Sequence, residues 1–174
     1  MPGSSLQTSP QTLPGGAAFL LSQVGAHVAA RFNECVAPLG LKPYHAGILS
    51  VLANKPGLTQ QSLADLLGIF PSRLVALLDD LAKLKLIERR ATPADRRTYA
   101  LHLTKAGTEM WVKIGKQAGQ MEEDICASLS AKERATLAEL LTRIVTQQQI
   151  TPGVHPGFRK LGSGSCDDEG SSKR

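Results

Sequence analysis

Apolar residues recur at helical spacing through most of the chain, and two short segments break that period. The first apolar run predicts a helix over residues 17–37 that ends at Pro38 and Gly40. A second helix follows Pro43 and stops before Pro56. Thr59 is a good N-cap for a short third helix, which Gly68 ends.

A fourth helix is predicted to begin at Pro71, which suits a first helical position. Its apolar residues follow the i, i+3, i+4, i+7 pattern of one buried face: Leu74, Leu77, Leu78 and Leu81. The period then changes, because residues 86–91 and 99–103 are short and suit strands. The polar turn TPADRRT between them predicts a β-hairpin with a charged tip.

Two long helices are predicted after the hairpin. Thr104 caps the first, and Ser130 with Glu133 forms a capping box for the second. The first carries a heptad-like seam of Trp111, Ile114, Ala118, Met121 and Ile125. This seam is either an intrachain core contact or a dimer interface made with the helix over residues 17–37. We favour the dimer, because one small lobe cannot cover three long apolar helix faces.

Both ends of the chain are rich in Ser, Pro and Gly and are expected to be flexible arms, over residues 1–15 and 151–174. No stretch approaches the roughly 20 apolar residues of a membrane span. The N-terminus lacks the pattern of a signal peptide, and three widely spaced cysteines make no disulfide framework. The expectation is a reduced, cytoplasmic protein without a membrane partner.

Positive charge is concentrated in residues 70–105, which hold eight cations and four anions and so +4 of the net charge of +5. The cations are Arg73, Lys83, Lys85, Arg89, Arg90, Arg96, Arg97 and Lys105. A basic window in a nearly neutral chain suggests a surface that binds nucleic acid. A solvated face is the alternative that composition leaves open.

A helix, a turn, a second helix and a basic hairpin form the pattern of a winged helix-turn-helix. A helix fits the major groove of DNA, and a hairpin tip reaches the adjacent minor groove. Three segments resemble the MarR family of bacterial transcriptional regulators: LTQQSLADLLGI (58–69), SRLVALLDDLAKLKLIERR (72–90) and TPADRRTYALHLTKAG (92–107). The last resembles the family's D-x-R wing followed by LTxxG.

The resemblance implies a mainly α fold with a small β-hairpin wing. It covers about residues 17–148, within a single domain over residues 16–150. Residues 16–40 and 104–150 would supply N- and C-terminal dimerisation helices, and residues 41–103 the winged-helix DNA-binding lobe. The implied function is a homodimeric regulator, expected to be a repressor that binds a palindromic promoter site in double-stranded DNA.

The resemblance also assigns DNA contacts. Arg97 would enter the minor groove, Asp95 would brace it, and Arg96 would meet phosphate. Arg73 is the best candidate for a base contact, because arginine can bond bidentately to guanine. The remaining candidates are Ser72 and Ala76 beside Arg73, and Thr59, Gln60 and Gln61 at a helix N-terminus that suits phosphate.

Four acidic or unusual positions qualify this assignment. Asp79 and Asp80 should face away from phosphates or pair with nearby arginines. Phe70 stands where this helix normally begins with a capping residue and cannot accept a backbone hydrogen bond. Lys85 replaces the glycine usual at the end of the helix, so a left-handed turn there is either strained or absent.

The input signal is implied by the family to be a small aromatic or phenolic ligand, bound between the dimer helices and the DNA-binding lobe. The candidate ligand residues are His27, Arg31, Tyr44, His45 and Trp111, which combine a cation, imidazoles and aromatic rings. Redox sensing through Cys35 is the alternative, while Cys126 and Cys166 give weaker grounds. Zinc sensing is disfavoured, because His27, His45, His102 and His155 form no metal-binding spacing.

Two rival classes remain. A winged helix can serve as a protein-interaction module without binding DNA, but such a module has no need for Arg96 and Arg97 at the tip. An enzyme is disfavoured because no GxSxG, P-loop, GxGxxG or metal-ligand cluster is present, and no cofactor is expected.

Overall fold

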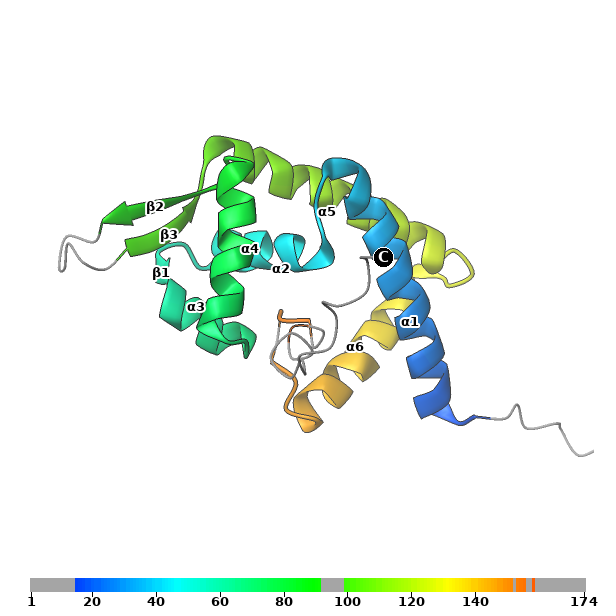
Figure 1. The fold of residues 1–174 in the computed structure, drawn as a ribbon. Helices are drawn as coiled ribbons and strands as arrows, with labels where there is room; N and C mark the ends of the chain where they lie inside the picture. The colour runs from blue at the N-terminus through cyan, green and yellow to red at the C-terminus, as the bar shows by residue number, and fades with distance from the viewer. Residues whose placement is uncertain (1–14, 92–98, 152, 156–157, 159–174) are drawn as a thin grey trace, which may run out of the picture.

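The computed structural model describes residues 15–91, 99–151, 153–155 and 158. These residues form a set of helices with a small antiparallel sheet at one side of the molecule (Figure 1). The elements are α1 (Ala17–Val36), η1 (Ala37–Leu39), α2 (Pro43–Asn54), β1 (Leu58–Thr59), α3 (Gln60–Leu67), α4 (Pro71–Lys83), β2 (Ile87–Ala91), β3 (Tyr99–Leu103), α5 (Lys105–Ile125) and α6 (Ala131–Gln147). The predicted fold class is therefore confirmed.

The core of the molecule lies among α2, α3, α4 and the sheet. The apolar stripe of α4 faces this core, where Leu74, Leu78 and Leu81 are fully buried. Leu63 and Leu67 of α3 and Leu101 of β3 meet them in the same cluster. The leucine pattern thus fixes the rotation of α4, which turns its polar side outward.

The sheet has the order β1-β3-β2 with both pairings antiparallel. The predicted hairpin is confirmed, with Ile87 opposite Leu103 and Ala91 opposite Tyr99. The additional strand β1 was not predicted. It pairs Leu58 with Leu101, and a two-residue strand carries no periodicity from which it could be recognised.

The left-handed turn after α4 is present with lysine in the glycine position. Lys85 has φ 57°, and its amide donates to the carbonyl of Ala82 at 2.9 Å. The amide of Leu86 donates to the carbonyl of Leu81 at 3.0 Å, which completes the helix end. Of the two expected alternatives, a strained turn is the correct one, because a β-carbon is disfavoured at this φ.

Gly107 allows α5 to approach the segment between α4 and β2. A β-carbon on Gly107 would lie 1.9 Å from the carbonyl oxygen of Leu86. The same segment is held by Thr104, whose Oγ1 donates to the carbonyl of Lys85 at 2.7 Å and whose amide donates to the carbonyl of Leu86 at 3.1 Å. Steric contact therefore explains the glycine of the LTxxG motif, because any side chain would push α5 away from the segment that leads into β2.

The two ends of the chain supply the long helices. α1 packs against α5 and α2, and Ile114 of the α5 seam is buried inside this one chain. The intrachain alternative for the seam therefore holds at Ile114. By contrast, no residue of α6 is buried, and Val36 is the one residue of α1 that is.

Phe158 lies within the segment expected to be a flexible C-terminal arm, and its side chain packs into the molecule. Its side chain is 2% exposed and belongs to the core cluster, and the partly buried Val154 packs against the same cluster. The surrounding sequence is rich in glycine and proline, so its composition gave no sign that one aromatic ring packs in the core.

No single described helix is long and apolar enough to cross a membrane. α3 and α4 together reach the length and apolarity of such a helix, but they are bent by 111° relative to each other.

Candidate DNA-binding interface

The outward face of α4 carries the candidate groove-reading residues. Ser72, Arg73 and Ala76 are all exposed, opposite the buried leucines, in the first two turns of the helix. The first turn of a recognition helix is the part that contacts base edges in helix-turn-helix proteins. Val75 is also exposed on α4, at 38%, and adds an apolar group that the sequence analysis did not single out.

The start of α4 has no side-chain cap, as Phe70 predicted. Its carbonyl accepts from the amides of Arg73 and Leu74 at 3.0 and 3.1 Å, while its ring is 63% exposed. Pro71 at the first helical position lacks an amide hydrogen and so reduces the number of uncapped donors. The exposed ring lies next to the candidate contact residues on the same helix end.

The three predicted phosphate contacts at the N-terminus of α3 differ in their hydrogen bonds and in their exposure. Thr59 Oγ1 accepts from the amide of Ser62 at 3.1 Å, which confirms the predicted cap. Gln61 is exposed and donates to the Asp65 carboxylate at 2.8 Å, and Gln60 is half-buried. The Thr59 hydroxyl is thus engaged in capping its own helix.

An ion pair links α4 to the hairpin. Arg89 of β2 donates to Asp79 of α4 at 2.9 Å. This confirms that Asp79 pairs with a nearby arginine, whereas Asp80 lies 3.5 Å from Lys83 instead. Arg89 was missed as a positioning residue, since the contact spans ten positions and crosses between elements.

The two arginines of the wing stem both pair with carboxylates, Arg89 with Asp79 of α4 and Arg90 with Glu88 of the same strand. Arg90 is exposed beside Ala91, and Tyr99 on the opposite strand is 51% exposed. β2 and β3 project from the side of the lobe as a two-stranded ribbon (Figure 1). The predicted tip residues Asp95, Arg96 and Arg97 lie outside the described residues.

The five predicted ligand residues do not form one site. His27 and Arg31 line a shallow hollow between α1 and the end of α5, together with Gln23, Val24, Asp124 and Ile125. Tyr44 of α2 instead packs edge-to-face on Phe158, with ring centroids 5.4 Å apart. Trp111 is half-buried against the core.

His45 is buried among its neighbours and does not line an open pocket. It is 4% exposed, its Nδ1 accepts from the amide of Lys42 at 3.2 Å, and its Nε2 lies 3.8 Å from the Asp80 carboxylate. Burial lowers the pKa of this imidazole, an effect that outweighs the opposing pull of Asp80. His45 therefore packs α2 against α4.

The cysteines and the possible metal ligands add little to the candidate site. Cys35 and Cys126 are free and half-buried. Within the described ranges, no group of three or more His, Cys, Asp or Glu side chains could hold a metal ion.

The fold and this surface define a winged-helix protein with an exposed polar helix face beside a two-stranded wing. The sequence profile of the MarR family matches residues 39–98. The chain is 38% identical over 113 residues to a proposed transcriptional regulatory protein for the hcr operon of Thauera aromatica, covering 65% of this chain and 68% of that protein. The chain belongs to the MarR family and is a DNA-binding transcriptional regulator, not an enzyme.

Two solved structures place such folds on DNA. The transcriptional repressor CouR, bound to a 23-mer DNA duplex, has 30% identity and a TM-score of 0.66, over 75% of this chain and 92% of that chain. A mutant of MarR from E. coli, complexed with operator DNA, has 25% identity and a TM-score of 0.62, over 74% of this chain and 92% of that chain.

Proposed function

We propose that this regulator is a repressor, which binds a palindromic promoter site as a homodimer and releases it when a small aromatic or phenolic ligand binds. The observation that carries the DNA-binding part is the exposed polar face of α4, with Arg73 on it, beside the wing. The repressor part draws on the similarity to CouR, whose DNA-bound form is described as a transcriptional repressor.

Each α4 would enter the major groove of one half-site, with the half-sites about one helical turn apart. Arg73 would read a base edge between Ser72 and Ala76. Arg97 would enter the minor groove braced by Asp95, and Arg96 would contact phosphate. Gln60 and Gln61 would approach phosphate at the start of α3, where Thr59 holds the helix end.

The homodimer is supported by the apolar side chains that one chain leaves uncovered on α1 and α6. They are Phe19, Leu20, Leu21, Val24, Leu137, Leu140 and Ile144, each 39–53% exposed. A monomer gains nothing from such a surface, whereas a second copy would bury it.

The wing assignment is tested with Arg97→Ala and fluorescence anisotropy on the intergenic DNA beside the protein's own gene. Affinity should fall roughly tenfold or more, and the salt dependence should weaken, because a cation leaves the DNA surface. Lys116→Ala on α5 is the control, as it removes an exposed charge away from the lobe. Unchanged affinity and salt slope for Arg97→Ala would show that the wing does not contact DNA.

The effector is tested by screening aromatic acids and phenols for thermal stabilisation, followed by release from the same DNA. We expect at least one ring compound to do both, and His27→Ala with Arg31→Ala reports whether the hollow on α1 is used. A flat screen under reducing conditions, together with loss of DNA binding on oxidation alone, would move the input to Cys35.

A further inference from the structure

A buried ring from the C-terminus lies on α2, where no aromatic partner was predicted. Phe158 contacts Tyr44 edge-to-face and approaches Gly47 so closely that a β-carbon there would lie 2.7 Å from its Cε2. Gly47 is in the middle of a helix, where glycine is otherwise unfavourable. The missing side chain therefore creates the space for the ring.

The described residues before Phe158 connect α6 to the DNA-binding lobe, and we call the described part of 150–158 the strap. After α6, Gln149 adopts a left-handed conformation with φ 52°, and the amide of Ile150 donates to the carbonyl of Val145 at 3.0 Å. After this reversal, Thr151 and Val154 line a pocket together with residues at the end of α3. The strap thus joins the end of α6 to α3 and α2.

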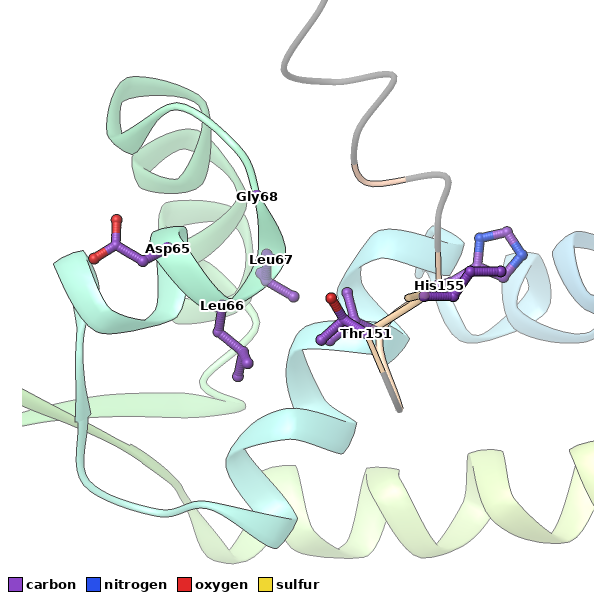
Figure 2. A pocket seen from close by; sticks show the side chains of 8 residues that line it. Asp65, Leu66, Leu67, Gly68, Thr151 and His155 are labelled. Carbon is purple, nitrogen blue, oxygen red and sulfur yellow. The ribbon is translucent and has the colours of Figure 1, made fainter. Parts of the chain in front are cut away.

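The strap is loosely packed on its α3 side. A cavity of about 170 Å³ lies between it and the end of α3, lined by Asp65–Gly68 and by Ile150, Thr151, Val154 and His155. Figure 2 shows Leu66 and Leu67 facing Thr151 across this space. Across a hollow of this size the strap and α3 are not close-packed.

Docking of the strap is consequently marginal. The gain from burying one phenyl ring is of the same order as the conformational entropy lost by ordering a few residues. A free ring that fills the same site carries no such cost of chain ordering. It would compete with Phe158 on favourable terms, provided that it matches the ring in size and shape.

We propose that Phe158 is a tethered occupant of an aromatic-binding site formed by Tyr44 and Gly47, and that a free one-ring aromatic molecule takes this site when the strap leaves. This deepens the effector part of the proposed function and rests on it. Because the strap joins α6 to the lobe, its release would free the lobe to change its position relative to the dimer helices. A ligand shifts this equilibrium by its preference for the released state.

The first test measures binding of 4-fluorophenol by ¹⁹F NMR to the full chain and to Phe158→Ala. Removing the tethered ring should raise the affinity for 4-fluorophenol at least tenfold. Phe70→Ala, which removes an exposed ring, is the matched control and should bind as the wild type does. Equal affinity of Phe158→Ala and the wild type would overturn the proposal.

A second variant covers the case in which Phe158→Ala does not fold. Gly47→Ala places a β-carbon in the path of the ring and should release the strap. Chymotryptic cleavage after Phe158, whose side chain is 2% exposed, should then become at least fivefold faster, whereas Gly119→Ala, with nothing within 4 Å of its new β-carbon, should leave the rate unchanged. An unchanged rate in Gly47→Ala would also overturn the proposal.

Neither readout involves DNA, so the strap and the proposed function can fail separately. If 4-fluorophenol binds Phe158→Ala tightly but leaves its affinity for operator DNA unchanged, the aromatic site stands and the effector role fails. If it binds no form of the protein, the aromatic site fails, whatever the DNA affinity.

Discussion

The DNA-binding lobe and the terminal helices differ in how much of their apolar surface one chain can cover. Six leucines of α3, α4 and β3 are buried completely within the lobe, whereas no residue of α6 is buried. The six are Leu63, Leu67, Leu74, Leu78, Leu81 and Leu101. The lobe therefore contains its own stabilising core, whereas the apolar faces of α1 and α6 stay partly exposed in one chain. The difference teaches that stability resides in the lobe, and it supports the proposal that a second copy covers the outer helices.

The largest expected effect contrasts Leu78→Ala with Leu140→Ala. Leu78 is fully buried, so its truncation should lower the free energy of unfolding by about 2–5 kcal/mol at any protein concentration. Leu140 is 47% exposed in one chain, so its truncation should act on the dimer and cost more on dilution. Denaturant unfolding at two protein concentrations measures both, and a concentration-independent loss for Leu140→Ala would remove the contrast.

Gly107→Ala is expected to have the next largest effect on stability. The new β-carbon would collide with the Leu86 carbonyl oxygen, so α5 must shift, at about 1–3 kcal/mol. Gly115→Ala in the same helix meets nothing within 4 Å and should instead stabilise the protein by up to about 1 kcal/mol. Thermal unfolding compares the two, and equal stability of both variants would contradict the close approach.

A smaller gain is expected from Lys85→Gly. Glycine tolerates the observed φ of 57° without a β-carbon clash, so the free energy of unfolding should rise by about 0.5–1 kcal/mol. Lys113→Gly, in the middle of α5, should lower it by about 1 kcal/mol. Urea denaturation distinguishes them, and a loss of stability in Lys85→Gly would show that the turn is unstrained.

The smallest effect is a pH dependence within the lobe. The pKa of His45 is lowered by burial, so below its ordinary value near 6.5 the unfolded state takes up the proton more readily than the folded one. Stability should therefore be full above that pH and fall as pH drops through this window. In His45→Gln, the part of the pH dependence of stability that is due to His45 should vanish. Thermal unfolding between pH 7 and pH 5 measures it, with His27→Gln as the control. An unchanged pH dependence in His45→Gln would assign it to other groups.

Local signals predicted most of the fold. Proline, glycine and capping residues set the helix bounds, because their effects act within one turn, as Thr59, Gly68 and Ser130 show. Contacts between distant positions were not predictable in the same way. The pairing of Leu58 with Leu101, the approach of Gly107 to Leu86 and the insertion of Phe158 against Gly47 each depend on tertiary packing.

The residues of the candidate site were likewise predictable only where a local sequence pattern placed them. The leucine period of α4 was enough to predict that Ser72, Arg73 and Ala76 face outward. The ligand residues could not be grouped from the sequence, since His45 turns toward Asp80 while Tyr44 meets Phe158. A periodic pattern defines a helix face, whereas a pocket depends on which faces meet.

The most direct test of the central claim is the ratio of affinities for operator and scrambled DNA, measured for the wild type and for Arg73→Ala at one salt concentration. If α4 reads bases through Arg73, the ratio should fall roughly tenfold or more, while affinity for scrambled DNA changes much less. An unchanged ratio would contradict the assignment of α4 as the helix that reads the operator.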